Sequence, residues 1–152
     1  MKIILGFSFG HRGNEPGLSN EAIAQAIREF DFDRSCVQWE IFLAMKKTST
    51  VANQVIWEHH EPFKYLDTRE VARQMAQYLH KNNFHKEEIL VFAHPDHLPR
   101  CMSELKKLNI SVVPIKAKIP YDPESYQIHT RCRLFYTVWE YIALLYRLFY
   151  KY

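Results

Sequence analysis

The chain has 152 residues and a formal net charge of +3; 47% of its residues are hydrophobic and 24% are charged. This balance is typical of a globular domain with a hydrophobic core, and it excludes a disordered chain. The basic residues form no long run, so no nucleic-acid partner is indicated. The three cysteines form no C-x-x-C motif, which predicts reduced thiols in a cytoplasmic protein.

The first half of the chain alternates between strand and helix patterns. Residues 2–8 form an apolar run typical of a buried strand, and a polar, glycine-rich loop follows over 9–17. Ser19 is predicted to cap the helix that starts after this loop. A second strand is predicted over 36–44 from four alternating apolar side chains: Val37, Trp39, Ile41 and Leu43.

The middle of the chain has one segment without a helix or strand pattern, and clear patterns follow it. Residues 46–65 fit neither the helix nor the strand period. A helix is predicted from Asp67 onwards, with Asp67 or Thr68 as its cap. The apolar run over 88–93 predicts a strand, and the helix after it is predicted to end at Asn109.

The last part predicts a strand over 110–115, a loop over 116–130 and an aromatic helix over about 132–150. Glu140 and Arg147 lie within that helix, which is also slightly short for a membrane span. We therefore expect it to be a packed or interfacial helix. Glu140 is expected to be the buried partner of an arginine, and a solvent-facing position is the alternative.

Strands separated by helices predict an α/β fold with a mostly parallel sheet and helices on both faces. No internal repeat or linker divides the sequence, so residues 1–152 are expected to form a single domain. Ligands of such folds bind beyond the carboxyl ends of the strands. Three segments follow predicted strands there, at 9–17, 94–97 and 116–126, and the third could close over a ligand as a lid.

The loop after the first strand contains Ser8, Gly10, His11 and Gly13. Glycines let the backbone approach a ligand, and the amides at the start of the following helix favour anions. The loop is not a Walker motif and lacks a full G-x-G-x-x-G, so a plain strand-to-helix connection is the alternative.

The segment from His94 to Arg100 combines two imidazoles, a carboxylate and a guanidinium at the end of a predicted strand. His97 and Arg100 are three residues apart, so on a helix they share one face. This pair suits an anionic ligand, which Arg100 would clamp while His97 exchanges a proton. Asp96 would orient His97 or, alternatively, cap the helix.

The same residues permit a metal site, because imidazoles and carboxylates bind zinc and similar ions. His94, Asp96 and His97 would be its ligands, and His59 and His60 are available in the segment without a clear pattern. A purely structural polar cluster is a further alternative.

Several segments resemble, in the same order, motifs of the YdcF/SanA/ElyC-like family, a group of bacterial proteins known as a domain of unknown function. Ile3-Ile4-Leu5-Gly6 resembles the opening strand of that family, and Gly17-Leu18-Ser19 resembles the start of its first helix. Three further segments are similar to its Asn-Thr-x-Glu-Asn-Ala, His-x-x-Arg and terminal Glu-containing motifs: 66–72, 92–100 and 139–147. The chain departs from the family at 44–47, at Val71 and at Glu61.

The resemblance implies a Rossmann-like three-layer sandwich with a pocket at the strand ends. It also implies binding of S-adenosylmethionine, to which members of the family have been linked. Transferred position by position, it points to six residues: Gly10, Thr68, Glu70, His97, Arg100 and Glu140.

These observations favour a small-molecule binding protein for an adenosine- or phosphate-bearing ligand, such as S-adenosylmethionine or a nucleotide, with transferase or hydrolase activity left open. His97 and Asp96 are the predicted catalytic residues, and no metal ligand is assigned. The predicted ligand-binding residues are Ser8, Gly10, His11, Gly13, Thr68, Glu70, His94, Arg100 and Glu140.

Two alternatives stay open. The first is a metal-dependent phosphoesterase that uses His94, Asp96 and His97. The second is a non-catalytic interaction module whose aromatic C-terminal helix meets a partner. The sequence does not set an oligomeric state.

Overall fold

The computed structural model of the chain describes residues 1–58 and 67–149, and for 146–149 it describes the backbone alone. In these residues one parallel sheet has the strand order β3-β2-β1-β4-β5. Its strands are β1 (Lys2–Gly6), β2 (Arg34–Gln38), β3 (Gln54–Ile56), β4 (Glu88–Phe92) and β5 (Val113–Pro114). The helices are α1 (Leu18–Arg28), α2 (Trp39–Lys47), α3 (Thr68–Lys81), α4 (Leu98–Lys107), the 3-10 turn η1 (Ile128–Thr130) and α5 (Arg133–Phe149).

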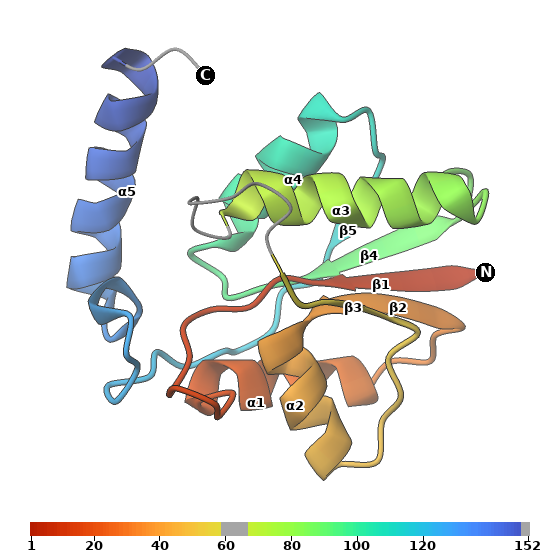
Figure 1. Ribbon diagram of the computed structural model, residues 1–152, viewed down its shortest axis with the longest axis horizontal. Coiled ribbons are helices and arrows are strands. Elements are labelled where there is room, and N and C mark those ends of the chain that lie inside the picture. Colours follow the sequence, from red (N-terminus) through yellow and green to blue (C-terminus); the bar gives the residue numbers. More distant parts are fainter. Residues whose placement is uncertain (59–66, 150–152) are drawn as a thin grey trace.

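Helices cover both faces of the sheet, which confirms the predicted Rossmann-like α/β sandwich (Figure 1). Successive side chains of a strand point to opposite faces. Ile3 and Leu5 of β1 accordingly pack in the core beneath α3 and α4, whereas Ile4 packs in the core beneath α1 and α2. β1 lies between β2 and β4 and is buried on both faces, which explains its continuous apolar sequence.

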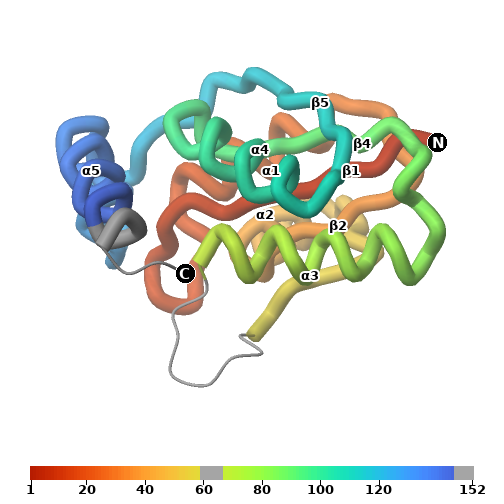
Figure 2. The backbone as a smooth tube through the Cα atoms, turned by 90° about the horizontal axis from the view of Figure 1, so that it is seen from above, coloured from red at the N-terminus to blue at the C-terminus, as the bar shows by residue number. Residues whose placement is uncertain are grey.

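The chain reverses its direction of travel across the sheet after β3. The first crossovers run outward from β1 through β2 to β3, and the chain then returns to place β4 on the other side of β1. Such a reversal leaves a crevice at the carboxyl ends of the two central strands, where ligands of these folds bind. Figure 2 shows α5 at this end of the sheet, away from the N-terminus.

Local sequence signals predicted several boundaries correctly. Asp67 caps α3, because its carboxylate accepts a hydrogen bond from the Glu70 amide at 2.8 Å. Asn109, with a left-handed φ of 57°, follows the end of α4 as predicted. The predicted strand over 88–93 is β4, and the aromatic helix is α5.

Two predicted strands were wrong in part. The chain leaves the sheet at Gln38, and the rest of the segment predicted as strand is helix α2. Ile41, Ala44 and Met45 are buried at helical spacing, so the helix period outweighs the alternation that suggested a strand. The strand predicted over 110–115 is reduced to Val113–Pro114 at the sheet edge.

The predicted cap by Ser19 was also wrong. The hydroxyl of Ser19 donates to the carbonyl of Pro120 at 2.8 Å, and Gly17 occupies the capping position. The Leu18 amide instead donates to the carboxylate of Asp122 at 3.0 Å. α1 therefore takes its cap from a residue that lies more than one hundred positions further along the chain.

α5 contacts the rest of the molecule through few side chains. Among the described residues no helix is long and apolar enough to cross a membrane. Large apolar side chains of α5 are nevertheless exposed by 44–69%: Leu134, Phe135, Val138, Trp139, Tyr141, Ile142, Leu144 and Leu145. Tyr136 is the exception, with 4% exposure.

Candidate functional site

A cavity of about 330 Å³ opens at the carboxyl ends of β1 and β2, beside the start of α4. We call it the strand-end cavity. It extends from the β2 side to the point between β1 and β4 where the strand order reverses, because His97 and Arg100 of the segment after β4 also line it. Its lining comes from the β1 loop, the starts of α2, α3 and α4, and the C-terminal segment: Ser8, Phe9, Gly10, His11, Gln38, Trp39, Glu40, Trp57, Asp67, Thr68, Val71, His97, Arg100, Gln127, His129, Thr130, Tyr136, Trp139 and Ala143.

The β1 loop that forms one wall is fixed by Asn20, which is fully buried in α1. Asn20 accepts a hydrogen bond from the Phe9 amide at 2.9 Å and donates to the carbonyls of Gly10 and Pro16 at 2.7 and 2.6 Å. The amide of Ser8 donates to the Gln38 side chain at 2.8 Å. Because these amides already have partners, the loop is not a phosphate cradle of the Walker type.

The glycines of this loop serve the packing of the chain on itself. Gly10 has φ +71°, and a Cβ atom there would lie 2.6 Å from the hydroxyl of Ser125. A larger residue would thus push away the C-terminal segment that closes the cavity. Gly13 lies against the ring of Tyr126 and does not line the cavity, although the sequence analysis assigned it to the ligand.

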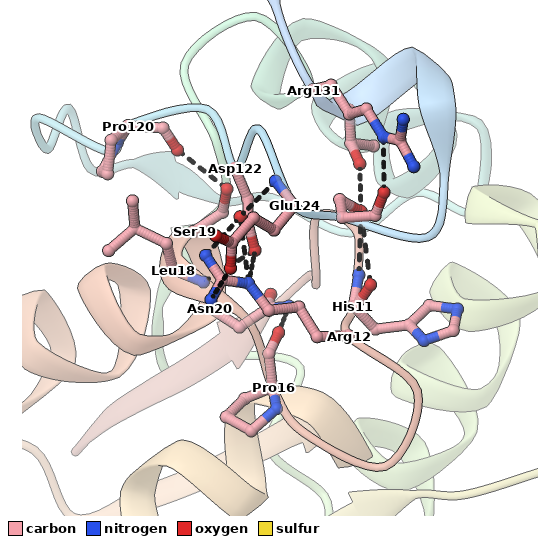
Figure 3. A network of polar contacts seen from close by, with 12 residues as sticks. His11, Arg12, Pro16, Leu18, Ser19, Asn20, Pro120, Asp122, Glu124 and Arg131 are labelled. Carbon is pink, nitrogen blue, oxygen red and sulfur yellow. Dashed lines mark hydrogen bonds and ion pairs between the residues drawn. The ribbon is translucent and has the colours of Figure 1, made fainter.

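Asp122 connects the β1 loop to the C-terminal segment, as Figure 3 shows. Its carboxylate accepts hydrogen bonds from the Arg12 guanidinium at 2.6–3.1 Å and from the amides of Leu18 and Glu124. Glu124 also pairs with Arg12 at 2.6 Å. Burial alone would raise the pKa of Asp122, but these donors together hold it below its ordinary value. We call this arrangement the Asp122 clasp.

The clasp bears on the lid predicted over 116–126. Besides Asp122, the Tyr126 amide donates to the carbonyl of His11 at 2.8 Å, and the Ser125 hydroxyl donates to the same carbonyl at 3.3 Å. The last part of the predicted lid is therefore bonded to the β1 loop. Lys116 and Lys118, which the prediction also included, are exposed and do not line the cavity.

His94 lies behind the cavity wall. Its ring stacks on Phe9 with centroids 4.1 Å apart, and its Nδ1 accepts from the Asp96 amide at 3.2 Å. Burial lowers the pKa of His94 to about 4, so the ring is neutral at pH 7. With Nδ1 as acceptor the proton sits on Nε2, which is buried and has no partner among the described residues. His94 is thus a neutral wall residue rather than a lining one.

His97 does line the cavity and is held from two sides. Its Nδ1 is 2.8 Å from the hydroxyl of Tyr136, and its Nε2 is 3.5 Å from the hydroxyl of Thr68. Burial, assisted by the positive charge of Arg100, lowers the pKa of His97 to about 3. A neutral imidazole can accept or donate a hydrogen bond in the cavity at pH 7, but it supplies no charge.

Glu140 pairs with an arginine, as predicted, and that arginine is Arg100, with a nitrogen-to-oxygen distance of 3.1 Å. Glu140 is about one-third exposed, so it is a half-buried partner and not a buried one. The pair joins α4 to α5, and Arg100 also lines the cavity. Burial raises the pKa of Tyr136, and the negative charge of Glu140 raises it further.

Asp96 has another role than the ones predicted from the sequence. Its carboxylate accepts a hydrogen bond from the Tyr121 hydroxyl at 2.5 Å and lies 3.6 Å from Arg133. It does not cap α4, whose capping position is His97, and it does not line the cavity. Asp96 anchors the C-terminal segment. Its carboxylate makes no hydrogen bond with His97, so the predicted role of Asp96 as the catalytic partner of His97 has no support from the described contacts.

Glu40 is one of several lining residues that were not predicted from the sequence, and it is the one that carries an acidic group into the first turn of a helix. It stands two positions after the end of β2, in the first turn of α2, and lines the cavity with 6% exposure. Burial raises the pKa of Glu40 to about 7, and the backbone of Glu40 itself, followed by Ser8, only partly offsets this. An acidic residue just after the second strand is a known signal in Rossmann folds, but the segment was interpreted as strand.

Aromatic rings form much of the remaining wall. Trp39 comes from α2, Trp57 follows β3, and Trp139 comes from α5. The ring of Trp139 stacks on His129 with centroids 4.8 Å apart and an angle of 15° between the planes. Such rings offer flat apolar surfaces on which a planar group can stack.

The predicted site residues therefore divide into two groups. Those that line the cavity are Ser8, Gly10, His11, Thr68, His97 and Arg100. Those that lie outside it are Gly13, Glu70, His94, Asp96 and Glu140. Of the second group, Glu140 and Asp96 hold charged or polar partners, and Glu70 is buried in the first turn of α3.

The metal-site alternative finds no ligand set within the described part of the chain. No three His, Cys, Asp or Glu side chains converge there on one point. His94 and His97 each pack against the ring of Phe9, and the carboxylate of Asp96 accepts a hydrogen bond from Tyr121. His59, His60 and Glu61 lie outside the described residues.

Comparisons with known proteins add little. No protein-family model matches the chain, and no curated protein matches it. Among solved structures, it is similar to the crystal structure of UDP-GlcNAc 2-epimerase from Neisseria meningitidis bound to UDP-GlcNAc, with 15% sequence identity and a TM-score of 0.46. The match covers 86% of this chain and 38% of the epimerase chain. A likeness this distant carries no argument about the ligand.

Proposed function

We propose that this protein binds a small molecule with an adenosine or phosphate group, such as S-adenosylmethionine or a nucleotide, in the strand-end cavity. The observation that carries the proposal is the cavity itself, at the carboxyl ends of the central strands. Its volume of about 330 Å³ is at the lower end of the range of small-molecule sites, about 300–1,000 Å³.

The lining suits a ligand that has one flat end and one anionic end. Trp39, Trp57 and Trp139 offer rings for a planar base. Arg100 offers a guanidinium for an anionic group. The first turns of α2, α3 and α4 all contribute lining residues, and the positive ends of helix dipoles favour an anion.

His97 is well placed to hydrogen-bond such a ligand, because its neutral ring lines the cavity. If Tyr136 accepts from Nδ1–H, the Nε2 atom is left as a hydrogen-bond acceptor on the side of Thr68. With a pKa of about 3 this atom is a weak base at pH 7, so the proposal is one of binding, and transferase or hydrolase activity stays open. The assignment to the YdcF/SanA/ElyC-like family and the cytoplasmic location stay predictions.

A thermal-shift panel on the purified protein tests the proposal. It would contain S-adenosylmethionine, S-adenosylhomocysteine, common nucleotides, sugar phosphates and divalent metals. A ligand at one hundred times its dissociation constant adds about 2.7 kcal/mol of stability, which shifts the midpoint by several degrees. A shift by an adenosine or phosphate compound supports the proposal, and the absence of any such shift overturns it.

Arg100→Ala tests the anionic end of the site. Loss of a charge-assisted hydrogen bond should weaken binding by about 1.5–3 kcal/mol, measured by calorimetry with the compound that gives the shift. Arg28→Ala, at the exposed end of α1 and not among the lining residues, is the matched control and should bind as the parent does. Unchanged affinity in Arg100→Ala would remove this residue from the site.

A second function is favoured by the exposed apolar side chains of α5, which suggest a docking surface. In this interaction module the helix would pack on a partner through residues such as Phe135 and Trp139, while Phe149 lies where side chains are not described. Sedimentation measurements with Leu134→Glu and Tyr141→Glu test it. A monomer at all concentrations, unchanged by these substitutions, would argue against self-association through α5.

A further inference from the structure

Glu40 has a feature that the proposed function does not explain. One of its carboxyl oxygens, Oε2, is buried and has no hydrogen-bond partner among the residues that the structure describes. The side chain is 6% exposed and lines the strand-end cavity. A buried polar atom without a partner costs about 1–3 kcal/mol, so such atoms are rare in folded proteins and call for an explanation.

Chemistry limits what can satisfy this oxygen. An ionised carboxylate only accepts hydrogen bonds, so its partner in a complex must be a donor. A phosphate group of the ligand is excluded at this position, because two negative charges in a poorly solvated wall repel each other. Hydroxyl groups fit, and the two oxygens of one carboxylate can accept from two neighbouring hydroxyls.

The place of Glu40 in the fold indicates which hydroxyls these are. In Rossmann folds that bind dinucleotides, an acidic residue beyond the second strand accepts from the ribose hydroxyls. Glu40 follows β2 in the same way, and both Glu40 and Ser8 of the β1 loop line the cavity. The chain lacks the full glycine motif of those folds, so the carboxyl itself and its open oxygen carry the argument.

We propose that Glu40 accepts hydrogen bonds from the 2′- and 3′-hydroxyls of a ribonucleoside ligand, so that the site selects ribose over deoxyribose. This rests on the proposed function, since it assumes a nucleoside-bearing ligand in the same cavity. Trp39 and Trp57 come from α2 and from beyond β3, on the Glu40 side, and the base lies against one of them. The anionic group points towards Arg100 on α4.

The test compares ribonucleotides with their 2′-deoxy counterparts. Adenosine, guanosine, cytidine and uridine 5′-monophosphates and the four deoxy forms would be titrated into the parent protein at pH 8. The nucleotide that binds should do so at least about tenfold more tightly in its ribose form, a factor that corresponds to about 1.4 kcal/mol. Glu40→Gln should reduce this preference to less than about threefold, because the amide accepts only at one atom.

Two controls keep the outcomes distinct. Glu29→Gln lies at the exposed end of α1 and should keep the full ribose preference. A normal unfolding transition of Glu40→Gln shows that it folds. If nucleotides bind the parent protein without a ribose preference, or if the preference survives in Glu40→Gln, this inference is wrong and the proposed function stands. If no nucleotide or nucleoside compound binds the parent protein, the inference fails together with the nucleoside part of the proposed function.

Discussion

The Asp122 clasp and the strand-end cavity are two polar regions at the same edge of the sheet, and they differ in how their groups are satisfied. Asp122 is 1% exposed and accepts from one guanidinium and two amides. Glu40 is 6% exposed, yet one of its oxygens has no partner in the described part of the chain. The pKa values move in opposite directions, downward at Asp122 and upward at Glu40.

The difference shows that polar residues near a strand end are not all functional. A saturated network stabilises the fold, because every buried group has found its partner within the chain. An open network costs stability, and such a cost is tolerated where a ligand provides the missing partner. The clasp is structural by this criterion. Glu40 combines an unpartnered oxygen with a place in the cavity lining, which the equally unpartnered Nε2 of His94 lacks, and this combination supports the proposed binding role.

Removal of the clasp should have the largest effect on stability. Asp122→Ala takes away an acceptor of Arg12 and leaves the Leu18 amide without its cap, so we expect the free energy of unfolding to fall by about 2–4 kcal/mol. Urea unfolding at pH 7 measures this change. Glu124→Ala removes the other partner of Arg12, but its side chain is 73% exposed, so less than about 1 kcal/mol should be lost. Equal losses in the two variants would show that the clasp is a surface contact.

Substitution of Glu40 should change the free energy of unfolding in the opposite direction, toward greater stability. The pKa of Glu40 is 4.5 in the unfolded chain and about 7 in the native state, so between these values the native state holds a proton that the unfolded chain has released. Stability contributed by the protonated carboxyl is thus present below about pH 4.5 and is lost as the pH rises through 7. Glu40→Gln should therefore gain about 2–3 kcal/mol over the parent protein between pH 5 and pH 8.

Urea unfolding of both proteins at several pH values measures this difference, and it separates Glu40 from the histidines. His94 and His97 have lowered pKa values and make both proteins less stable below about pH 6.5. That contribution cancels when the variant is compared with the parent at each pH. A constant difference across the range would mean that Glu40 is ionised throughout, and it would remove the contrast with Asp122.

The sequence predicted those parts of the molecule that depend on neighbouring residues. The apolar runs of β1 and β4 and the capping of α3 by Asp67 are local signals, and the structure confirmed them. The cap of α1 by Asp122 joins residues that are 104 positions apart, and no local pattern contains it. Ser19 was chosen because it is the residue type that caps helices, but its hydroxyl is used by Pro120.

The candidate site was predicted in part for the same reason. His97 and Arg100 were correctly placed together, since three residues on a helix fix their relative position. Glu40 was missed because Trp39, Ile41 and Leu43 alternate as in a strand, which assigned the residue to the sheet. Ile41, Ala44 and Met45 are buried at the spacing of a helix. A helix over these residues ends the strand before Glu40 and places Glu40 just beyond the strand end.

Tyr136→Phe should have the smallest effect on stability. It also tests whether His97 has a structural role, like the residues of the Asp122 clasp, or serves the ligand in the strand-end cavity. The hydroxyl of Tyr136 lies 2.8 Å from Nδ1 of His97, in a residue that is 4% exposed. Its removal should cost about 1 kcal/mol in urea unfolding, because Nδ1 loses its partner. If His97 serves the ligand, affinity for the nucleotide identified in the binding panel should also fall severalfold, since the imidazole is no longer held in place. Tyr141→Phe, 66% exposed on the same helix, should change neither quantity. Lower stability with unchanged affinity would place His97 with the clasp, as a structural residue.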